Sequence, residues 1–149
     1  MSPRFVSVFL LYNNLSNTRC ILFIIEVRAT QVISLIVKNE FGVMQRVMGE
    51  FTRNKINVET IVVGKCEQVG KSRMVLSVID KDQATLAVGR LEKLQDVFDA
   101  RLVEESGQSA YALISTTGGN VGVVGVSSQV DEIIERSRPE RFVKALNAL

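Results

Sequence analysis

Residues that could bind a small ligand stand at two places in this chain. The first is the phrase NEFG, Asn39 to Gly42, which interrupts one apolar run and is followed by another with a different period. The second is the phrase KINVETIVV, in which Asn57 opens the next apolar run. An asparagine side chain both donates and accepts hydrogen bonds, and glycine adopts backbone conformations barred to other residues. Both phrases could therefore serve a turn or a ligand.

The NEFG phrase has a specific chemistry if a helix begins at Gly42. The first backbone N–H groups of that helix, at Gly42, Val43 and Met44, would lack partners within it. Such groups and the helix dipole attract an anion such as a carboxylate, and Asn39 could add a side-chain hydrogen bond. Local chemistry alone favours a simpler explanation, in which Asn39 caps the helix, because most polar residues at helix starts are local caps.

Other chemistries have little support in this sequence. The chain has no His, so hydrolytic triads and zinc hydrolase sites lose their commonest residue. Its two cysteines, Cys20 and Cys66, lie far apart and outside any CxxC, which argues against a disulfide framework and a thiolate metal site and makes the reducing cytoplasm the expected compartment. The phrase GGNVGVVG, Gly118 to Gly125, matches neither phosphate-loop spacing, so we expect a hairpin there. We predict no catalytic residue and no metal ligand.

Composition limits the class of protein further. The 149 residues suit one ordinary domain, or one small domain and part of a second, and the 46% hydrophobic and 23% charged shares are those of a soluble globular protein. The formal charge of +2 is spread along the chain without a basic block, so no nucleic-acid partner is expected. The apolar runs in residues 1–30 fall short of the about twenty residues that span a membrane. We interpret 1–30 as an N-terminal extension, such as an extra strand or a misassigned start.

The elements that must position the two phrases follow from periodicity. The order is strand, helix, strand, strand, helix, strand, which indicates an α+β, ferredoxin-like βαββαβ unit over 31–105, with two helices on one face of an antiparallel sheet. The central strands lack the aromatic residues that an RNA-binding sheet would need. The predicted elements, in chain order, are a strand at Gln31–Lys38, a helix from Gly42 to about Lys55, strands at Ile56–Lys65 and Arg73–Ile79, a helix capped by Asp80 or Asp82, and a strand at Val97–Glu104.

The remaining residues, 106–149, form a short α/β C-terminal segment, truncated or partial as a second domain. Strands are expected on both sides of the turn TGGN, followed by the helix VDEIIERS. After Pro139, the stretch RFVKALNAL is predicted to be a further helix. About forty residues do not easily fold alone, so we expect this segment to pack on the first unit or on a partner.

A resemblance to a known family bears on both phrases. The most specific pieces are N-E-x-G-x-x-x-R-V at Asn39 to Val47, N-[IV]-E at Asn57 to Glu59, and S-R-M at Ser72 to Met74. They resemble the ACT domain of the regulatory small subunit of acetohydroxyacid (acetolactate) synthase, from Gln31 to about Glu105. The resemblance implies a non-catalytic, cytoplasmic protein that binds valine, or leucine or isoleucine, and that activates and feedback-regulates a catalytic large subunit. It also implies that this chain needs no cofactor, while the partner enzyme uses thiamine diphosphate, Mg and FAD.

The same resemblance implies a homodimer with the effector between two ACT domains. Asn39, Gly42, Val43 and Met44 would hold the ligand from one chain, and Asn57 and Val58 would hold it from the partner. The topology makes this sharing reasonable, because the first two strands of the unit run parallel and place Asn39 and Asn57 at opposite ends of the sheet. A small apolar pocket separates ligands that differ by a methylene by only about 1–3 kcal/mol, so the three amino acids remain alternatives.

Two other classes of function remain open. One is a free-standing ACT-type amino-acid sensor, or a transcriptional effector-binding module, without an enzyme partner; no helix-turn-helix is evident in the sequence. The other is a small enzyme, for which the sequence offers no convergent acid and base pair.

Overall fold

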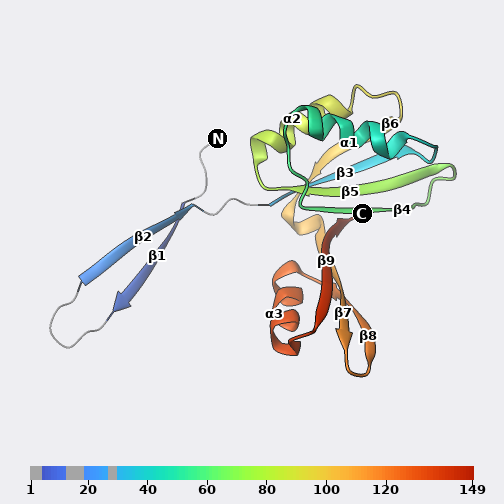
Figure 1. The fold of residues 1–149 in the computed structure, drawn as a ribbon. Coiled ribbons are helices and arrows are strands. Elements are labelled where there is room, and N and C mark those ends of the chain that lie inside the picture. The colour runs from blue at the N-terminus through green and yellow to red at the C-terminus, as the bar shows by residue number, and fades with distance from the viewer. Residues whose placement is uncertain (1–4, 13–18, 27–29) are drawn as a thin grey trace.

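The computed structural model describes residues 5–12, 19–26 and 30–149, which form three separate sheets (Figure 1). The extension predicted at the N-terminus contains two strands, β1 (Phe5–Tyr12) and β2 (Arg19–Glu26), paired as an antiparallel hairpin. The break expected between the two apolar runs of this extension, at 13–18, lies outside the described residues.

The central sheet has the order β4-β5-β3-β6, and each of its neighbouring pairs is antiparallel. Its two helices cover one face (Figure 1). This arrangement confirms the predicted βαββαβ fold. The elements are β3 (Gln31–Lys38), α1 (Val43–Arg53), β4 (Thr60–Lys65), β5 (Lys71–Val78), α2 (Lys81–Leu91) and β6 (Val97–Val103).

The core lies between the helices and the sheet. Helix α1 buries Val43, Val47 and Phe51, which recur every fourth residue and therefore lie on one face. They pack against alternate residues of β3, namely Ile33, Leu35 and Val37, and of β5, namely Met74, Leu76 and Val78. The other face of β3 is buried as well, which explains why QVISLIVK reads as an almost continuous apolar run.

Two local predictions are refined by the structure. Asp80 caps α2, since its side chain accepts a hydrogen bond from the Asp82 N–H at 2.8 Å. The predicted strand at Ile56–Lys65 begins only at Thr60. The residues before it cross from α1 to the sheet edge, and they are held there because Ile56 is buried and its N–H donates to the Phe51 carbonyl oxygen.

The C-terminal residues form a second, smaller unit. A 3-10 turn, η1 (Glu105–Gly107), leads into a sheet of order β8-β7-β9, with α3 against one face. The hairpin expected around TGGN is confirmed, with Thr116 opposite Gly119. The elements are β7 (Gln108–Thr116), β8 (Gly119–Gly125), α3 (Ser127–Ser137) and β9 (Arg141–Ala148).

The prediction of a helix at RFVKALNAL is wrong, because these residues form strand β9. Ala, Leu and Lys favour helices locally. However, β7 offers a row of backbone hydrogen-bond partners, and β9 pairs with it from Ser115 opposite Arg141 to Gln108 opposite Ala148. The chain turns back for this pairing at Arg138, whose φ is +44°, and at Pro139, which cannot continue α3. Tertiary pairing overrides local preference here.

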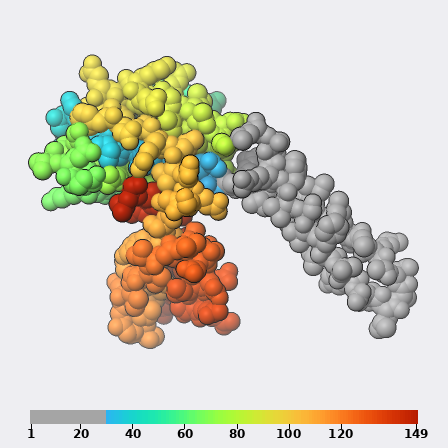
Figure 2. All heavy atoms as spheres, turned by 180° about the vertical axis from the view of Figure 1, so that it is seen from behind, coloured from blue at the N-terminus to red at the C-terminus, as the bar shows by residue number. Residues whose placement is uncertain are grey.

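Strand β9 also joins the two units. Val32 and Val75, on the face of the central sheet that the helices leave uncovered, pack with Ala148 of β9 in one buried cluster. The Leu146 N–H donates to the Thr60 Oγ1 at 3.3 Å. Figure 2 shows the end of β9, in red, at the junction between the units. Within the described part of the chain, no helix is long and apolar enough to span a membrane.

Candidate functional site

The NEFG turn lies at the end of β3, where two neighbouring loops hold its backbone. The Lys38 N–H donates to the Asp96 carbonyl oxygen at 2.9 Å, in the connection between α2 and β6. The Asn39 N–H donates to the Gly70 carbonyl oxygen at 3.0 Å, in the turn between β4 and β5. The Asn39 side chain is exposed. The turn is therefore fixed through its main chain, while the amide of Asn39 faces solvent.

The start of α1 has no side-chain cap. Gly42 is the N-cap residue, with φ +82°, a left-handed conformation that favours glycine. Asn39 does not cap the helix, so the capping interpretation is wrong. The Val43 N–H approaches the Glu40 carbonyl oxygen at a long 3.4 Å, and the N–H groups of Gly42 and Met44 find no acceptor among the described residues. These donors remain available to an anion.

Arg46 adds a positive charge to this turn. A Cβ atom placed on Gly42 would lie 2.9 Å from the Arg46 Nη1, so the guanidinium lies directly over the glycine. The Arg46 Nε donates to the Asp96 carboxylate, which orients the side chain. Arg46 is part of the N-E-x-G-x-x-x-R-V motif, but the sequence alone predicted no role for it. The available signal was its position four residues after Gly42, because side chains on a helix lean toward its N-terminus.

The apolar residues of the turn divide into two kinds. The Val43 side chain is buried in the core, so only its N–H can face a ligand. Met44 is about half exposed, and Phe41 is fully exposed beside it in sequence. Val69, in the β4–β5 turn, is also fully exposed, and Phe98 on β6 is half exposed with the Lys71 Nζ 4.1 Å from its ring centroid. We call Phe41, Met44, Val69 and Phe98 the apolar tip.

The second predicted phrase lies between α1 and β4. The Asn57 side chain is exposed and donates to the Glu59 Oε1 at 2.9 Å. Val58 is half-buried and packs against the core. The Glu59 N–H donates to the Ser77 carbonyl oxygen, which ties this segment to the end of β5.

Within one chain the structure does not bring the two asparagines together. Lys38, which precedes Asn39, pairs with Lys71 at the start of β5, whereas Thr60 pairs with Ser77 near its end. Strand β5 has eight residues and is therefore about 24 Å long. The two phrases lie at opposite ends of the sheet (Figure 1), as the topology predicted.

An ion pair that sequence reasoning missed stabilises the β4–β5 turn. Arg73 of the SRM phrase donates to both carboxylate oxygens of Glu67, at 2.9 and 2.8 Å. Hydrogen bonding from Arg73 is the main cause that lowers the pKa of Glu67 from 4.5 to about 2. The same hydrogen bonds, donated to Glu67, raise the pKa of Arg73. The same turn carries Gly70, which accepts the Asn39 N–H. Arg73 therefore positions the NEFG turn indirectly.

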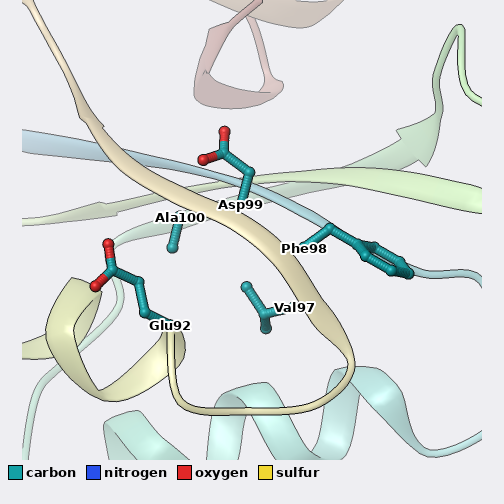
Figure 3. Close-up of a pocket in the computed structure, with 5 residues that line it drawn as sticks. All are labelled: Glu92, Val97, Phe98, Asp99 and Ala100. Atoms are coloured by element: carbon teal, nitrogen blue, oxygen red, sulfur yellow. The ribbon is translucent and has the colours of Figure 1, made fainter.

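A small hollow of about 130 Å³ lies between the end of α2 and β6 (Figure 3). Val97 and Ala100 lie on its helix side, and Asp99 points to the other side of the strand. Its charged lining residues, Glu92 and Asp99, are both carboxylates, so it offers an anionic ligand no partner. None of the predicted effector residues lines it. Within the described residues, no group of three or more His, Cys, Asp or Glu side chains could hold a metal ion.

Comparison with known proteins agrees with this geometry. The family described as "AHAS small subunit-like ACT domain" matches residues 33–99. A probable acetolactate synthase small subunit of Methanothermobacter thermautotrophicus is 40% identical over 76 residues, covering 50% of this chain and 45% of that protein. The acetolactate synthase small subunit of Bacillus subtilis is 30% identical over 116 residues, covering 72% and 63%. The chain spans about half the length of the curated relatives it matches.

A solved structure extends the similarity of fold. The crystal structure of the acetolactate synthase small subunit from Thermotoga maritima superposes with a TM-score of 0.65 at 19% identity, covering 80% of this chain and 96% of that chain. The four-stranded sheet with two helices on one face is an ACT-like βαββαβ fold. Residues 33–99 match the family model of the acetohydroxyacid synthase small-subunit-like ACT domain. The chain is similar in sequence to these acetolactate synthase small subunits.

Proposed function

We propose that this chain is a regulatory subunit of an acetolactate synthase in branched-chain amino acid biosynthesis. It binds L-valine, or leucine or isoleucine, between the ACT domains of two chains in the cytoplasm. Binding then activates or feedback-regulates a catalytic large subunit that uses thiamine diphosphate, Mg and FAD. The observation that carries this proposal is the NEFG turn of a small-subunit-type ACT domain. Its N–H groups at Gly42 and Met44 have no acceptor among the described residues, and the Arg46 guanidinium lies over Gly42.

The chemistry of the turn suits the carboxylate of an amino acid. The helix N–H groups, the Asn39 amide and the Arg46 guanidinium all donate hydrogen bonds. Half-exposed Met44 and half-buried Val58 offer apolar surface for an aliphatic side chain. Asn57, from the second chain, would bind the ammonium or carboxylate group.

Pairing of two chains through the edge strand β4 brings Asn39 of one chain closest to Asn57 of the other. If two copies pair antiparallel through β4, the end of β4 beside one Asn39 meets the start of the other β4, beside Asn57. Asn39 and the partner's Asn57 are then separated by three strand spacings, about 14 Å, which two side chains and a ligand largely fill. Pairing through β6 would separate them by five spacings, about 24 Å, which a single amino acid cannot bridge. We therefore assign the homodimer to β4.

Ligand-induced stabilisation tests the effector site. A ligand that binds only the folded protein raises its melting temperature by mass action, by about 2.7 kcal/mol at one hundred times Kd. We expect L-valine to raise Tm, and Asn39→Ala or Asn57→Ala to reduce that shift. Gln45→Ala, an exposed position on α1, is the matched control and should keep it. No stabilisation by valine, leucine or isoleucine would remove the effector assignment.

Co-purification tests the enzyme partner. The apolar tip groups large side chains at one end of the sheet, a feature typical of interaction surfaces. We expect the chain to associate with a thiamine-diphosphate-dependent large subunit and to change its activity. If the chain binds valine but neither associates with such a subunit nor alters its activity, the free-standing sensor is the correct function.

A further inference from the structure

A cleft of about 330 Å³ lies between the ACT domain and the C-terminal unit. None of the residues assigned to the effector lines it, and its volume lies in the lower part of the range for small-ligand pockets, about 300–1,000 Å³. We propose that this cleft is a second ligand site, formed within one chain, for a small zwitterion of the α-amino acid class. Its polar lining residues come from both units: Thr30, Glu59, Thr60, Ser77, Ser127, Asp131 and Lys144.

Glu59 supplies an acceptor for an ammonium group. Its Oε1 accepts a hydrogen bond from the neutral amide of Asn57, and within the described residues it forms no salt bridge. With Asp131 and Lys144, the cleft carries two carboxylates and one ammonium. The ammonium group of the ligand would pair locally with the Glu59 carboxylate, which no cation in the described residues neutralises.

Lys144 supplies a donor for a carboxylate. Its Nζ donates to the Asp131 Oδ1 at 2.6 Å and to the Ser127 Oγ at 2.7 Å, so two contacts from α3 orient it. An ammonium group has three hydrogens, and the third has no acceptor among the described residues. The Lys144 side chain is only 21% exposed, which limits its freedom. Glu59, just before β4, and Lys144, on β9, thus provide opposite charges from the two units that line the cleft.

A pair of hydroxyl groups adds a second donor. The Thr60 Oγ1 and Ser77 Oγ are 2.6 Å apart; the first also accepts the Leu146 N–H, and the second accepts the Thr60 N–H. Whichever hydroxyl donates to the other, one of the two hydroxyl hydrogens has no acceptor among the described residues. Ser77 is buried and Thr60 is half-buried, and both residues line the cleft. A ligand oxygen in the cleft would accept this hydrogen.

The apolar part of the lining limits the size of the ligand. Ile79, Ala145 and Leu146 border the polar groups and can contact a short aliphatic side chain. The cleft therefore combines an acceptor for ammonium, donors for carboxylate and a small apolar wall. This combination matches an aliphatic α-amino acid better than a simple anion, a simple cation or an uncharged molecule.

Amide chemical shifts of the full chain separate this site from the proposed effector site. We would titrate Asn39→Ala protein with L-valine, and in parallel with isobutylamine and isovalerate, which lack the carboxylate and the ammonium respectively. We expect L-valine to shift the resonances of Thr60, Lys144 and Leu146, and each analogue to bind at least tenfold more weakly. In the unsubstituted protein, shifts at Gly42 and Met44 would report the effector site independently.

Two variants test the residues themselves. Lys144→Met keeps the aliphatic stem and Thr60→Val keeps the branched shape, and we expect each to weaken valine binding in the cleft at least tenfold while leaving the shifts at Gly42 and Met44 intact. The melting temperature of each variant verifies that it is folded. No shift at Thr60, Lys144 and Leu146 with millimolar valine, leucine or threonine would overturn the proposal. So would equally strong binding of isobutylamine or isovalerate.

Discussion

Gly42 is the residue on which the geometry of the candidate effector turn depends most. Its left-handed backbone would cost another residue about 1–2 kcal/mol, and a side chain would meet the Arg46 guanidinium. We therefore expect Gly42→Ala to lower the free energy of unfolding by at least about 1 kcal/mol, measured by urea denaturation. Gly89→Ala, on α2 with open space around it, should instead stabilise the protein by about 1 kcal/mol. Equal effects of both changes would contradict this account.

The ion pair between Glu67 and Arg73 is expected to make stability depend on pH. The folded pKa of Glu67, about 2, lies below its ordinary value of 4.5, so the pair stabilises the protein fully above pH 4.5 and this contribution is lost as pH falls toward 2. In Arg73→Met protein we expect the Glu67 carboxylate, followed by NMR, to titrate near 4.5. Arg136→Met, which breaks a different exposed pair, should leave that titration unchanged. An unaltered Glu67 titration in Arg73→Met would show that the pair has no such role.

At the scale of elements, sequence periodicity predicted most of the fold. The helical spacing of its apolar residues predicted α1, and a short apolar run predicted strand β3. Asp80 marks the start of α2. The failure at β9 has a clear cause. RFVKALNAL has no strong pattern of its own, and its conformation depends on β7, thirty residues earlier. The residues of β9 alone therefore do not predict that it pairs with β7.

The exposed edge of β4 leads to a prediction about assembly. Ile61 and Val63 are 40% and 39% exposed on the helix side of this edge. Charged residues on an edge strand oppose pairing with another strand. We expect Ile61→Lys with Val63→Lys to make the protein monomeric in light scattering and to abolish the valine-induced shifts of the Gly42 and Met44 resonances. Leu86→Lys on α2, where the leucine is 45% exposed, is the control and should remain dimeric. A dimer that survives both lysines would assign the interface elsewhere.

At the scale of the whole molecule, the positions of the NEFG and KINVETIVV phrases could be predicted from sequence, but their surroundings could not. Asn39 and Asn57 lie where the topology placed them, at opposite ends of one sheet. The role of Arg46 depends on a helix side chain leaning over Gly42, and that of Arg73 depends on the β4–β5 turn. The cleft between the units depends on where β9 packs, and the position of β9 cannot be predicted from local sequence patterns.

We propose that Asn39 of one chain and Asn57 of another form one effector site. Mixing two variants that are each inactive at this site tests the shared site directly. Asn39→Ala and Asn57→Ala proteins, each unable to bind valine at this site alone, would be unfolded together and refolded as an equimolar mixture. The binding would be followed at the Gly42 and Met44 resonances. Each mixed dimer then contains one intact site, so we expect the mixture to regain about a quarter of the wild-type sites. A mixture that binds no more valine there than either variant alone would contradict the shared site.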